Sequence, residues 1–218
     1  RRHQKVIEEA PSPLIDETTR ERIGEAACES ARSVGYLGAG TVEFIVAADD
    51  PDEFFFIEMN TRLQVEHPVT EQTTGLDLVV EQLRVADGLP LSINATPAPL
   101  GHAIEFRINA EDVGRGFLPT PGPVQRFEVP GGPGVRVDTG VLAGSTVPGS
   151  FDSLMAKLIV TGSTREQALA RARRALAEFQ IEGVASVLPF HRAVMEHADF
   201  IGADGFKVHT RWIETAFA

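Results

Sequence analysis

Hydrophobic and polar positions alternate most clearly between residues 54 and 70, in the stretch FFFIEMNTRLQVEHPVT. Three phenylalanines and an isoleucine open this stretch and predict a β-strand. Polar side chains then occupy every second position, a set that we call the polar series: Glu58, Asn60, Arg62, Gln64 and Glu66. Because residues two apart in an extended chain point to the same face, all five are expected on one strand face. A solvated edge strand often shows such alternation, but two carboxylates, two amides and a guanidinium in one row favour a binding surface.

The segment Thr41–Val46 predicts a preceding strand that returns through an aspartate-rich loop to Phe54, as an antiparallel hairpin. This pairing brings Glu43 toward Glu58. Two neighbouring carboxylates repel each other unless a cation lies between them, and Asn60 adds an oxygen on the face of Glu58. Mg²⁺ binds one or two carboxylates together with water and substrate phosphates. The hairpin therefore predicts a nucleoside triphosphate site.

The remaining pattern predicts an α+β protein. A helix is expected from Asp16, as N-cap, to Gly35, and Cys28 within it is expected to be a small buried residue. A second helix is expected over residues 75–86, with an apolar stripe at Leu76, Val79, Val80 and Leu83. A linker rich in proline follows and places a domain boundary near Pro97, which divides the chain into residues 1–97 and 98–218.

The second half predicts a strand over residues 101–112, in which Glu105, Arg107 and Asn109 alternate with apolar residues. This second polar alternation makes Arg107 a candidate site residue. A further strand is expected over residues 153–160, and Thr164 and Gln167 form a capping box that opens a helix to about Phe179. Short helices are expected over residues 189–197 and 210–217, and a short strand over residues 6–10.

Composition narrows the classes of function. The 218 residues carry a formal net charge of −11, with 43% hydrophobic and 23% charged residues, as in an ordinary globular protein. The acidic balance argues against a nucleic-acid partner, because no basic cluster could follow phosphates. Cys28 is the only cysteine, so neither a disulfide within the chain nor a cysteine zinc site is expected. We expect no membrane span and a cytoplasmic location, and the start at Arg1 suggests an interior piece of a longer protein.

These motifs together resemble biotin carboxylase, a member of the ATP-grasp superfamily. The resemblance covers essentially the whole chain and is carried by Glu43, EMNTRLQVEHPVTE, EFRINAED, RRHQKV, FLPTPG, GVRVDTG and FDSLMAKLIV. Other ATP-grasp ligases share only the acidic residue followed two positions later by asparagine. PFHRAV and HTRWIET near the end are most similar to the biotin-carrying α-subunits of actinobacterial acyl-CoA carboxylases.

The resemblance implies a fold, an activity and partners. The fold would be the C-terminal half of an ATP-grasp domain, mainly antiparallel sheet with flanking helices, followed by a biotin carboxylase C-terminal α+β domain. The activity would be ATP- and bicarbonate-dependent carboxylation of biotin through carboxyphosphate, with Mg²⁺ or Mn²⁺. Biotin would be attached to a separate carrier domain. A second biotin carboxylase copy, in a homodimer, and a carboxyltransferase β-subunit would be further partners.

The resemblance also assigns roles to residues by motif. Glu43, Glu58 and Asn60 would hold the metal, and Arg62, Gln64 and the backbone of Val65 would bind bicarbonate. Glu66 would be the general base, with Arg62 and Lys5 as catalytic cations. Arg107 would bind biotin and stabilise its enolate oxygen. The ATP-binding positions would be His3, Glu43, Ile45, Glu58, Val208 and His209.

Some implications are negative. The family's N-terminal domain and glycine-rich ATP lid are absent from these 218 residues, so the chain alone is expected to be inactive. Met155–Leu158 is similar to a biotinylation site, but the order of residues differs and Lys157 is not expected to carry biotin.

Two alternatives and one open choice remain. The first alternative is a non-catalytic module for the association of subunits, in which Arg136 would contact a second copy. The second is a ligase like carbamoyl-phosphate synthetase, which lacks the Gln-Val-Glu-His-Pro extension. The final carboxyl acceptor stays open among acyl-CoA, pyruvate and urea.

Overall fold

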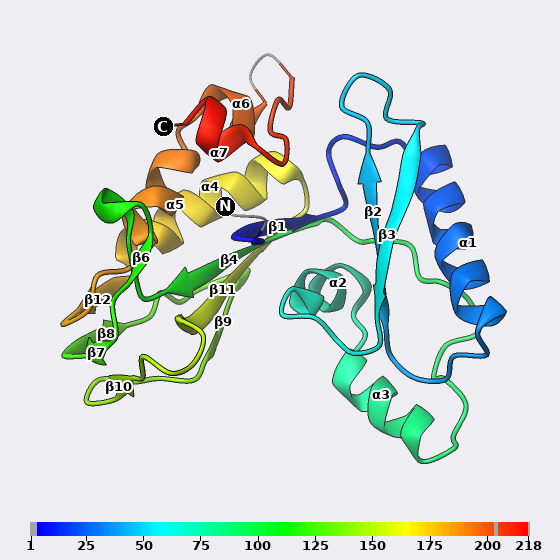
Figure 1. Cartoon of the computed structure of the whole chain (residues 1–218), viewed down its shortest axis with the longest axis horizontal. Coiled ribbons are helices and arrows are strands. Elements are labelled where there is room, and N and C mark those ends of the chain that lie inside the picture. Colours follow the sequence, from blue (N-terminus) through cyan, green and yellow to red (C-terminus); the bar gives the residue numbers. More distant parts are fainter. Residues whose placement is uncertain (1–3, 203–204, 218) are drawn as a thin grey trace. The chain divides into compact units, whose positions relative to one another are not determined.

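The structure, a computed structural model, describes residues 4–202 and 205–217. The chain divides into two compact units, which we treat separately (Figure 1). The hairpin unit comprises Pro11–Pro99, and the sheet unit comprises Arg1–Ala10 together with Leu100–Ala218. The first strand of the chain thus belongs with its second half, which the linear order of residues does not indicate. The predicted domain limits at residues 97 and 98 stay a prediction.

The hairpin unit contains one helix before and two helices after an antiparallel strand pair. Helix α1 (Glu17–Ser33) begins as expected, with the Asp16 carboxylate accepting a hydrogen bond from the Thr19 amide at 2.8 Å. Strands β2 (Thr41–Val46) and β3 (Phe54–Asn60) form the predicted hairpin. Helices α2 (His67–Thr74) and α3 (Leu78–Ala86) follow.

The polar series does not lie on one strand, which corrects the sequence-based expectation. Strand β3 ends at Asn60, the chain bends at residues 61–62, and α2 begins at His67. Pro68 lies in the first turn of α2, where the missing amide hydrogen of proline does no harm. Gly75 ends α2 in a left-handed conformation with φ of 74°, so the helix expected over residues 75–86 is the shorter α3.

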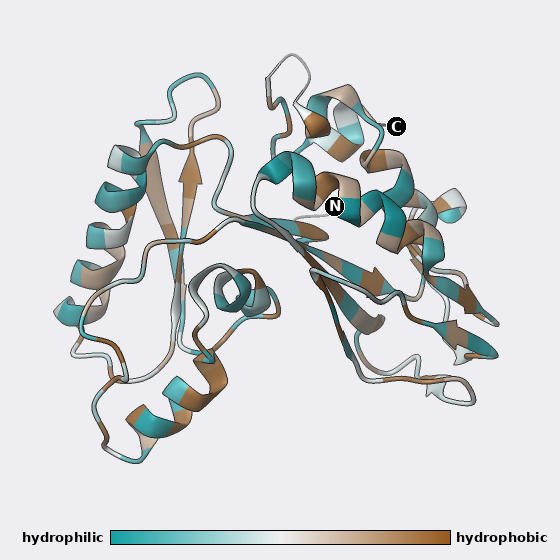
Figure 2. Ribbon diagram, turned by 180° about the vertical axis from the view of Figure 1, so that it is seen from behind, coloured by the Kyte–Doolittle hydropathy of each residue, from teal (hydrophilic) through white to brown (hydrophobic). Residues whose placement is uncertain are grey.

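Two expectations about burial in the hairpin unit are also corrected. Residues Val79, Val80 and Leu83 of the predicted apolar stripe are 44%, 48% and 62% exposed, and α3 is partly brown in the hydropathy view of Figure 2. Cys28 is exposed rather than buried. Helix α1 has Thr19 as its buried residue, so most of its surface, including the position of Cys28, faces outward.

The sheet unit is organised around four antiparallel strands in the order β1-β4-β11-β9. Their bounds are Ile7–Ala10 for β1, His102–Asn109 for β4, Leu154–Gly162 for β11 and Val135–Thr139 for β9. Helices α4 (Arg165–Glu178) and α5 (Leu188–Val194) pack on one face of this sheet (Figure 1). The expected strands and the capped helix are thereby confirmed.

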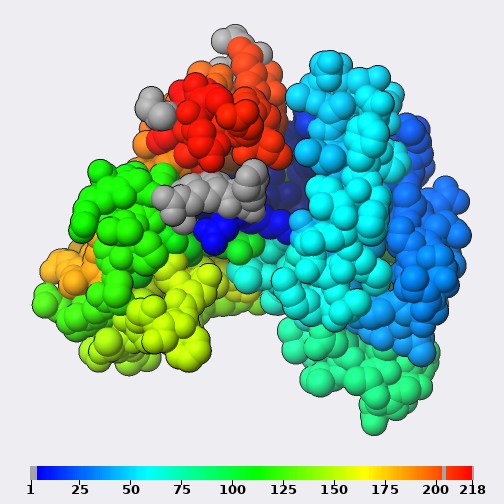
Figure 3. Space-filling model, in the orientation of Figure 1, coloured from blue at the N-terminus to red at the C-terminus, as the bar shows by residue number. Residues whose placement is uncertain are grey.

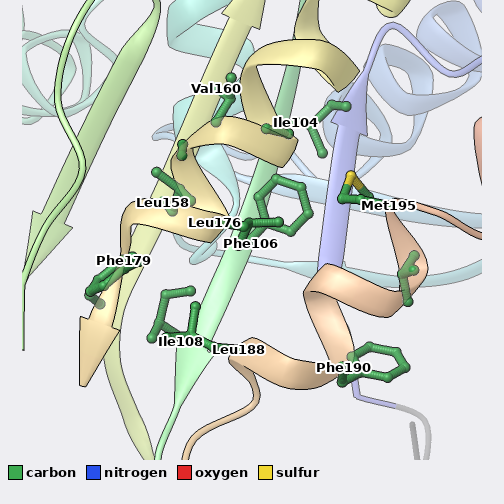
Figure 4. Packing of buried hydrophobic residues seen from close by; sticks show 14 of the residues in the cluster. Ile104, Phe106, Ile108, Leu158, Val160, Leu176, Phe179, Leu188, Phe190 and Met195 are labelled. Atoms are coloured by element: carbon green, nitrogen blue, oxygen red, sulfur yellow. The ribbon is translucent and has the colours of Figure 1, made fainter. Parts of the chain in front are cut away.

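The core of the sheet unit lies between that face and the two helices. Ile104, Phe106 and Ile108 of β4 are fully buried there, against Leu158 and Val160 of β11 and residues of α4 and α5 (Figure 4). Glu105, Arg107 and Asn109 alternate with them and therefore project from the opposite face. The alternation predicted for β4 is confirmed, although the strand expected to reach residue 112 divides at Ala110 into β4 and β5 (Glu111–Asp112).

Short elements complete the sheet unit. The remaining strands are β6 (Leu118–Pro119), β7 (Gly122–Pro123), β8 (Arg126–Glu128), β10 (Thr146–Val147) and β12 (Gln180–Glu182). The remaining helices are the 3₁₀ turn η1 (Val113–Arg115), α6 (Ala198–Ile201) and α7 (Trp212–Thr215). Every strand pair within residues 4–202 and 205–217 is antiparallel, which confirms the α+β class. Among the described residues, no helix is both long and apolar enough to cross a membrane.

Candidate active site

A β-bulge in the hairpin brings Glu43 directly opposite Glu58. Phe44 pairs with Phe56, whereas Glu43 pairs with Glu58, so Ile57 is an extra residue on β3. Such a bulge bends a strand and redirects the side chains after it. The carboxylates of neighbouring strands thus share one register position, and the predicted approach of Glu43 to Glu58 is observed.

The side chain of Asn60 joins these two carboxylates. Its Nδ2 donates to Glu43 Oε1 at 3.1 Å and to Glu58 Oε1 at 2.8 Å. Gln64 Nε2 also donates to Glu43 Oε1. Both carboxylates therefore direct an oxygen toward one point, which the amide nitrogen of Asn60 occupies.

This donor set fits a divalent cation such as Mg²⁺. Two carboxylate oxygens converge on one point, and rotation of the Asn60 amide would present its oxygen to the same point. No group of three His, Cys, Asp or Glu side chains suited to a metal occurs among the described residues. The site would therefore complete its coordination with water and substrate phosphates, as Mg²⁺ sites commonly do.

The rest of the polar series lies on the connection between β3 and α2. Arg62 is exposed and donates from Nη1 to the Leu63 carbonyl at 3.1 Å. Gln64 is buried, and the bend after Asn60 carries it back to Glu43. Glu66 is half-buried and is the residue immediately before α2. The structure therefore brings Glu43, Glu58, Asn60 and Gln64 into contact. Arg62, Val65 and Glu66 lie on the same connection as Gln64, between β3 and α2.

The half of the hairpin nearest its connecting loop carries exposed apolar side chains. Ile45 of β2 and Phe55, Phe56 and Ile57 of β3 are all exposed. The hairpin, in cyan, forms part of the visible surface in Figure 3. Ile45, a predicted ATP-binding position, is thus accessible to a ligand.

In the sheet unit, Arg107 is held by a carboxylate from the neighbouring strand. Glu8 Oε1 accepts a hydrogen bond from Arg107 Nε at 2.7 Å, and both side chains are largely buried. Glu8 was not identified from the sequence. Residues Val6–Ala10 show no alternation of apolar and polar positions that would indicate its direction, and only the pairing of β1 with β4 reveals its partner.

Three of the predicted site residues line one cavity of the sheet unit. Lys5, Val208 and His209 surround a cavity of about 320 Å³ together with Ile7, Phe190 and Trp212. An apolar lining with a few polar groups is a common setting for a ligand such as adenine. His3, the remaining predicted ATP contact, lies outside the described residues.

Comparison with known proteins identifies the family. The profile of the biotin carboxylase C-terminal domain matches residues 105–215, about half of the chain. The chain belongs to the biotin carboxylase family. Residues 1–94 match the ATP-binding domain of the carbamoyl-phosphate synthase L chain. The expected architecture, an ATP-grasp C-terminal part followed by a biotin carboxylase C-terminal domain, is thereby confirmed.

Individual relatives in this family support the assignment. The chain is 57% identical over 216 residues to the biotin-dependent acyl-coenzyme A carboxylase alpha3 subunit of Mycobacterium leprae, covering 99% of this chain and 36% of that protein. It is 48% identical to biotin carboxylase 1 of Bacillus subtilis, covering 99% of this chain and 47% of that protein. The chain therefore spans less than half the length of these relatives.

A solved structure shows the same fold with ligands. The biotin carboxylase domain dimer of Hydrogenobacter thermophilus 2-oxoglutarate carboxylase, in complex with MgADP, ADP and bicarbonate, has a TM-score of 0.92 and 42% identity. The match covers 98% of this chain and 46% of that one.

Proposed function

We propose that this chain forms the metal- and bicarbonate-binding half of a biotin carboxylase active site. In this proposal, an N-terminal domain and an ATP lid are contributed by polypeptide outside these 218 residues. The convergence of Glu43 and Glu58 on the amide of Asn60, beside Gln64, carries the proposal. Family membership and the ligands of the related structure support it.

The residues of the polar series would act on bicarbonate. The planar guanidinium of Arg62 and the amide of Gln64 suit a planar oxyanion, because each can donate hydrogen bonds in its plane. Glu66 would accept the proton of bicarbonate and so make its oxygen a nucleophile toward the γ-phosphate of ATP. Lys5 would supply a second positive charge near this anion. When bound, the divalent cation would neutralise charge on the transferred phosphate.

The sheet unit would contribute the biotin- and adenine-binding groups. Arg107 would donate to the ureido oxygen of biotin as negative charge develops there, in the manner of an oxyanion hole. The cavity lined by Val208 and His209 would receive the adenine ring, and Ile45 would contact the nucleotide. The biotin would be presented by a separate carrier domain.

The final acceptor of the carboxyl group is proposed to be an acyl-CoA. The acyl-CoA carboxylase protein from Mycobacterium leprae is 57% identical, whereas a pyruvate carboxylase component from Methanothermobacter thermautotrophicus is 48% identical. The complete enzyme, incubated with its carboxyltransferase, should carboxylate acetyl-CoA or propionyl-CoA in preference to pyruvate. Carboxylation of pyruvate alone would contradict the acyl-CoA assignment.

Replacement of Glu66 tests the proposed reaction. In the complete biotin carboxylase that contains this chain, Glu66→Gln keeps the size of the side chain but removes the base. Bicarbonate-dependent ATP cleavage and biotin carboxylation should both fall by about 100-fold or more. Glu53→Gln, in the exposed loop between β2 and β3, should leave both rates unchanged. Retention of ATP use and carboxylation in Glu66→Gln would exclude the catalytic role and favour a module for the association of subunits.

A further inference from the structure

The imidazole of His191 contacts the backbone of the strand that carries Arg107. His191 lies on α5 and is completely buried. Its Nε2 lies 2.7 Å from the Arg107 carbonyl oxygen, and an oxygen of this kind can only accept, so Nε2 is the donor. The ring packs edge-on against Phe106, with 5.3 Å between ring centroids.

The carbonyl of Arg107 lies where the pairing of β4 with β1 ends. Strand β1 pairs with β4 from Ala103 to Phe106, and the last backbone hydrogen bond on this edge is the one that the Arg107 amide donates to the Val6 carbonyl at 3.1 Å. On the other edge, the pairing of β11 with β4 shifts between Leu154 and Ala156, close to Asn109. The strand therefore requires other partners at this point to keep its backbone in one place.

Helix α5 provides these partners at two points. The Val187 amide donates to the Asn109 carbonyl at 3.1 Å, and His191 Nε2 donates to the Arg107 carbonyl. Val187 and His191 are four residues apart, so they lie on one face of the helix. Arg107 and Asn109 are two residues apart, so their carbonyls point to the same edge of the strand. The helix thus holds β4 on both sides of residue 108.

The histidine is an unfavourable choice for packing alone. Its Nδ1 is buried and accepts no hydrogen bond from any residue that the structure describes. Burial also lowers the pKa of the ring to about 4, so the ring is neutral with one donor and one unsatisfied acceptor. A leucine or phenylalanine would fill this apolar site without an unsatisfied nitrogen. What these residues lack is the donor to the Arg107 carbonyl.

We propose that His191 is a positioning residue for Arg107. It fixes the backbone from which the Arg107 side chain extends, while Glu8 fixes the guanidinium at Nε. The inference rests on the proposed role of Arg107 at biotin. It predicts that loss of the His191 donor slows the carboxylation of biotin and leaves bicarbonate-dependent ATP cleavage, which precedes that step, unchanged.

The test separates these steps in the complete biotin carboxylase that contains this chain. His191→Phe fills the site but cannot donate, whereas His191→Gln places an amide donor near the position of Nε2. We expect His191→Phe to lower the rate of biotin carboxylation by about 10- to 100-fold and to raise the KM for biotin. Bicarbonate-dependent ATP cleavage measured without biotin should stay within about twofold of the wild-type rate, since Arg107 is not used there. His191→Gln should restore most of the carboxylation rate.

A neighbouring residue of α5 serves as the matched control. Arg192 donates to the carbonyls of Leu176 and Phe179 and therefore supports α4 instead of β4. Arg192→Gln should weaken the fold without separating the two rates. An equal fall of both rates in His191→Phe, or the same separation in Arg192→Gln, would overturn the inference. If His191→Phe does not fold, His191→Asn, whose shorter side chain does not reach the carbonyl, is subject to the same criterion.

Arg107→Gln distinguishes failure of the inference from failure of the proposed function. If Arg107→Gln leaves biotin carboxylation unchanged, the proposed role of Arg107 is wrong and the inference falls with it. If Arg107→Gln impairs carboxylation and the donor-free His191 variants do not, the inference alone is wrong.

Discussion

His191 should make the stability of the sheet unit depend on pH. Burial lowers the pKa of this histidine to about 4, from an ordinary value of 6.5. Between these two pH values the unfolded chain binds a proton that the folded chain does not. The free energy of unfolding therefore decreases as the pH falls from 6.5 to 4, and this contribution is fully present only above pH 6.5.

The pKa difference sets the magnitude of this effect. The change from 6.5 to about 4 corresponds to about 3 kcal/mol of unfolding free energy, a large share of the stability of an ordinary domain. His191→Gln does not titrate in this range and should lose this pH dependence. Because the other ionisable groups are common to both proteins, they cancel in the difference between wild type and variant.

The measurement is denaturant unfolding at several pH values from 7 to 4. Trp212 is the only tryptophan of the chain and is 3% exposed within the sheet unit, so its emission maximum reports unfolding of that unit. The stability of the wild type relative to His191→Gln should decrease by about 3 kcal/mol as the pH falls through this range. A difference that stays constant from pH 7 to pH 4 would refute the assignment of a buried, neutral His191.

Three other predictions concern a glycine, the proposed cation site and the chain as a whole. Gly183→Ala should destabilise the sheet unit by about 2 kcal/mol or more in thermal unfolding, because φ is 100° and a Cβ would lie 2.2 Å from the Pro123 carbonyl oxygen. Gly144→Ala, with φ of 92° and no atom within 4 Å of the added Cβ, is its control, and equal losses would exclude the steric explanation. In the complete enzyme, Asn60→Ala should raise the Mg²⁺ concentration needed for half-maximal ATP cleavage by about 10-fold, whereas Asn94→Ala should not change it. The isolated 218-residue chain should show no bicarbonate-dependent ATP cleavage, and measurable turnover would contradict the requirement for a lid.

Local sequence rules predicted the features that depend on residues close together in the chain. Asp16 caps α1 and Thr164 caps α4 as expected, since a cap depends on residues three positions away. The alternation of β4 likewise predicts which of its side chains enter the hydrophobic core, because one face of that strand meets the core, although Glu105 on the other face is fully buried as well. These features require no knowledge of distant parts of the chain.

Other features depend on contacts that such rules do not describe. The apolar stripe of α3 is present in the sequence, but its exposure depends on what packs against it in three dimensions. Glu8 and Arg107 are 99 residues apart, and only the pairing of β1 with β4 brings them together. The link between His191 and the Arg107 carbonyl spans 84 residues and joins a helix to a strand edge.

The carboxylate pair shows how a correct prediction can rest on an incomplete reason. Hairpin pairing alone suggested that Glu43 approaches Glu58. Without the bulge, however, the register from Phe44 and Phe56 would place Glu43 opposite Ile57. The extra residue moves Glu58 into that position, and the bend after Asn60 returns Gln64 to the carboxylate of Glu43. Period-two alternation treats residues 58–66 as one extended strand, but Glu43, Glu58, Asn60 and Gln64 come together because that period is interrupted on both sides of Glu58.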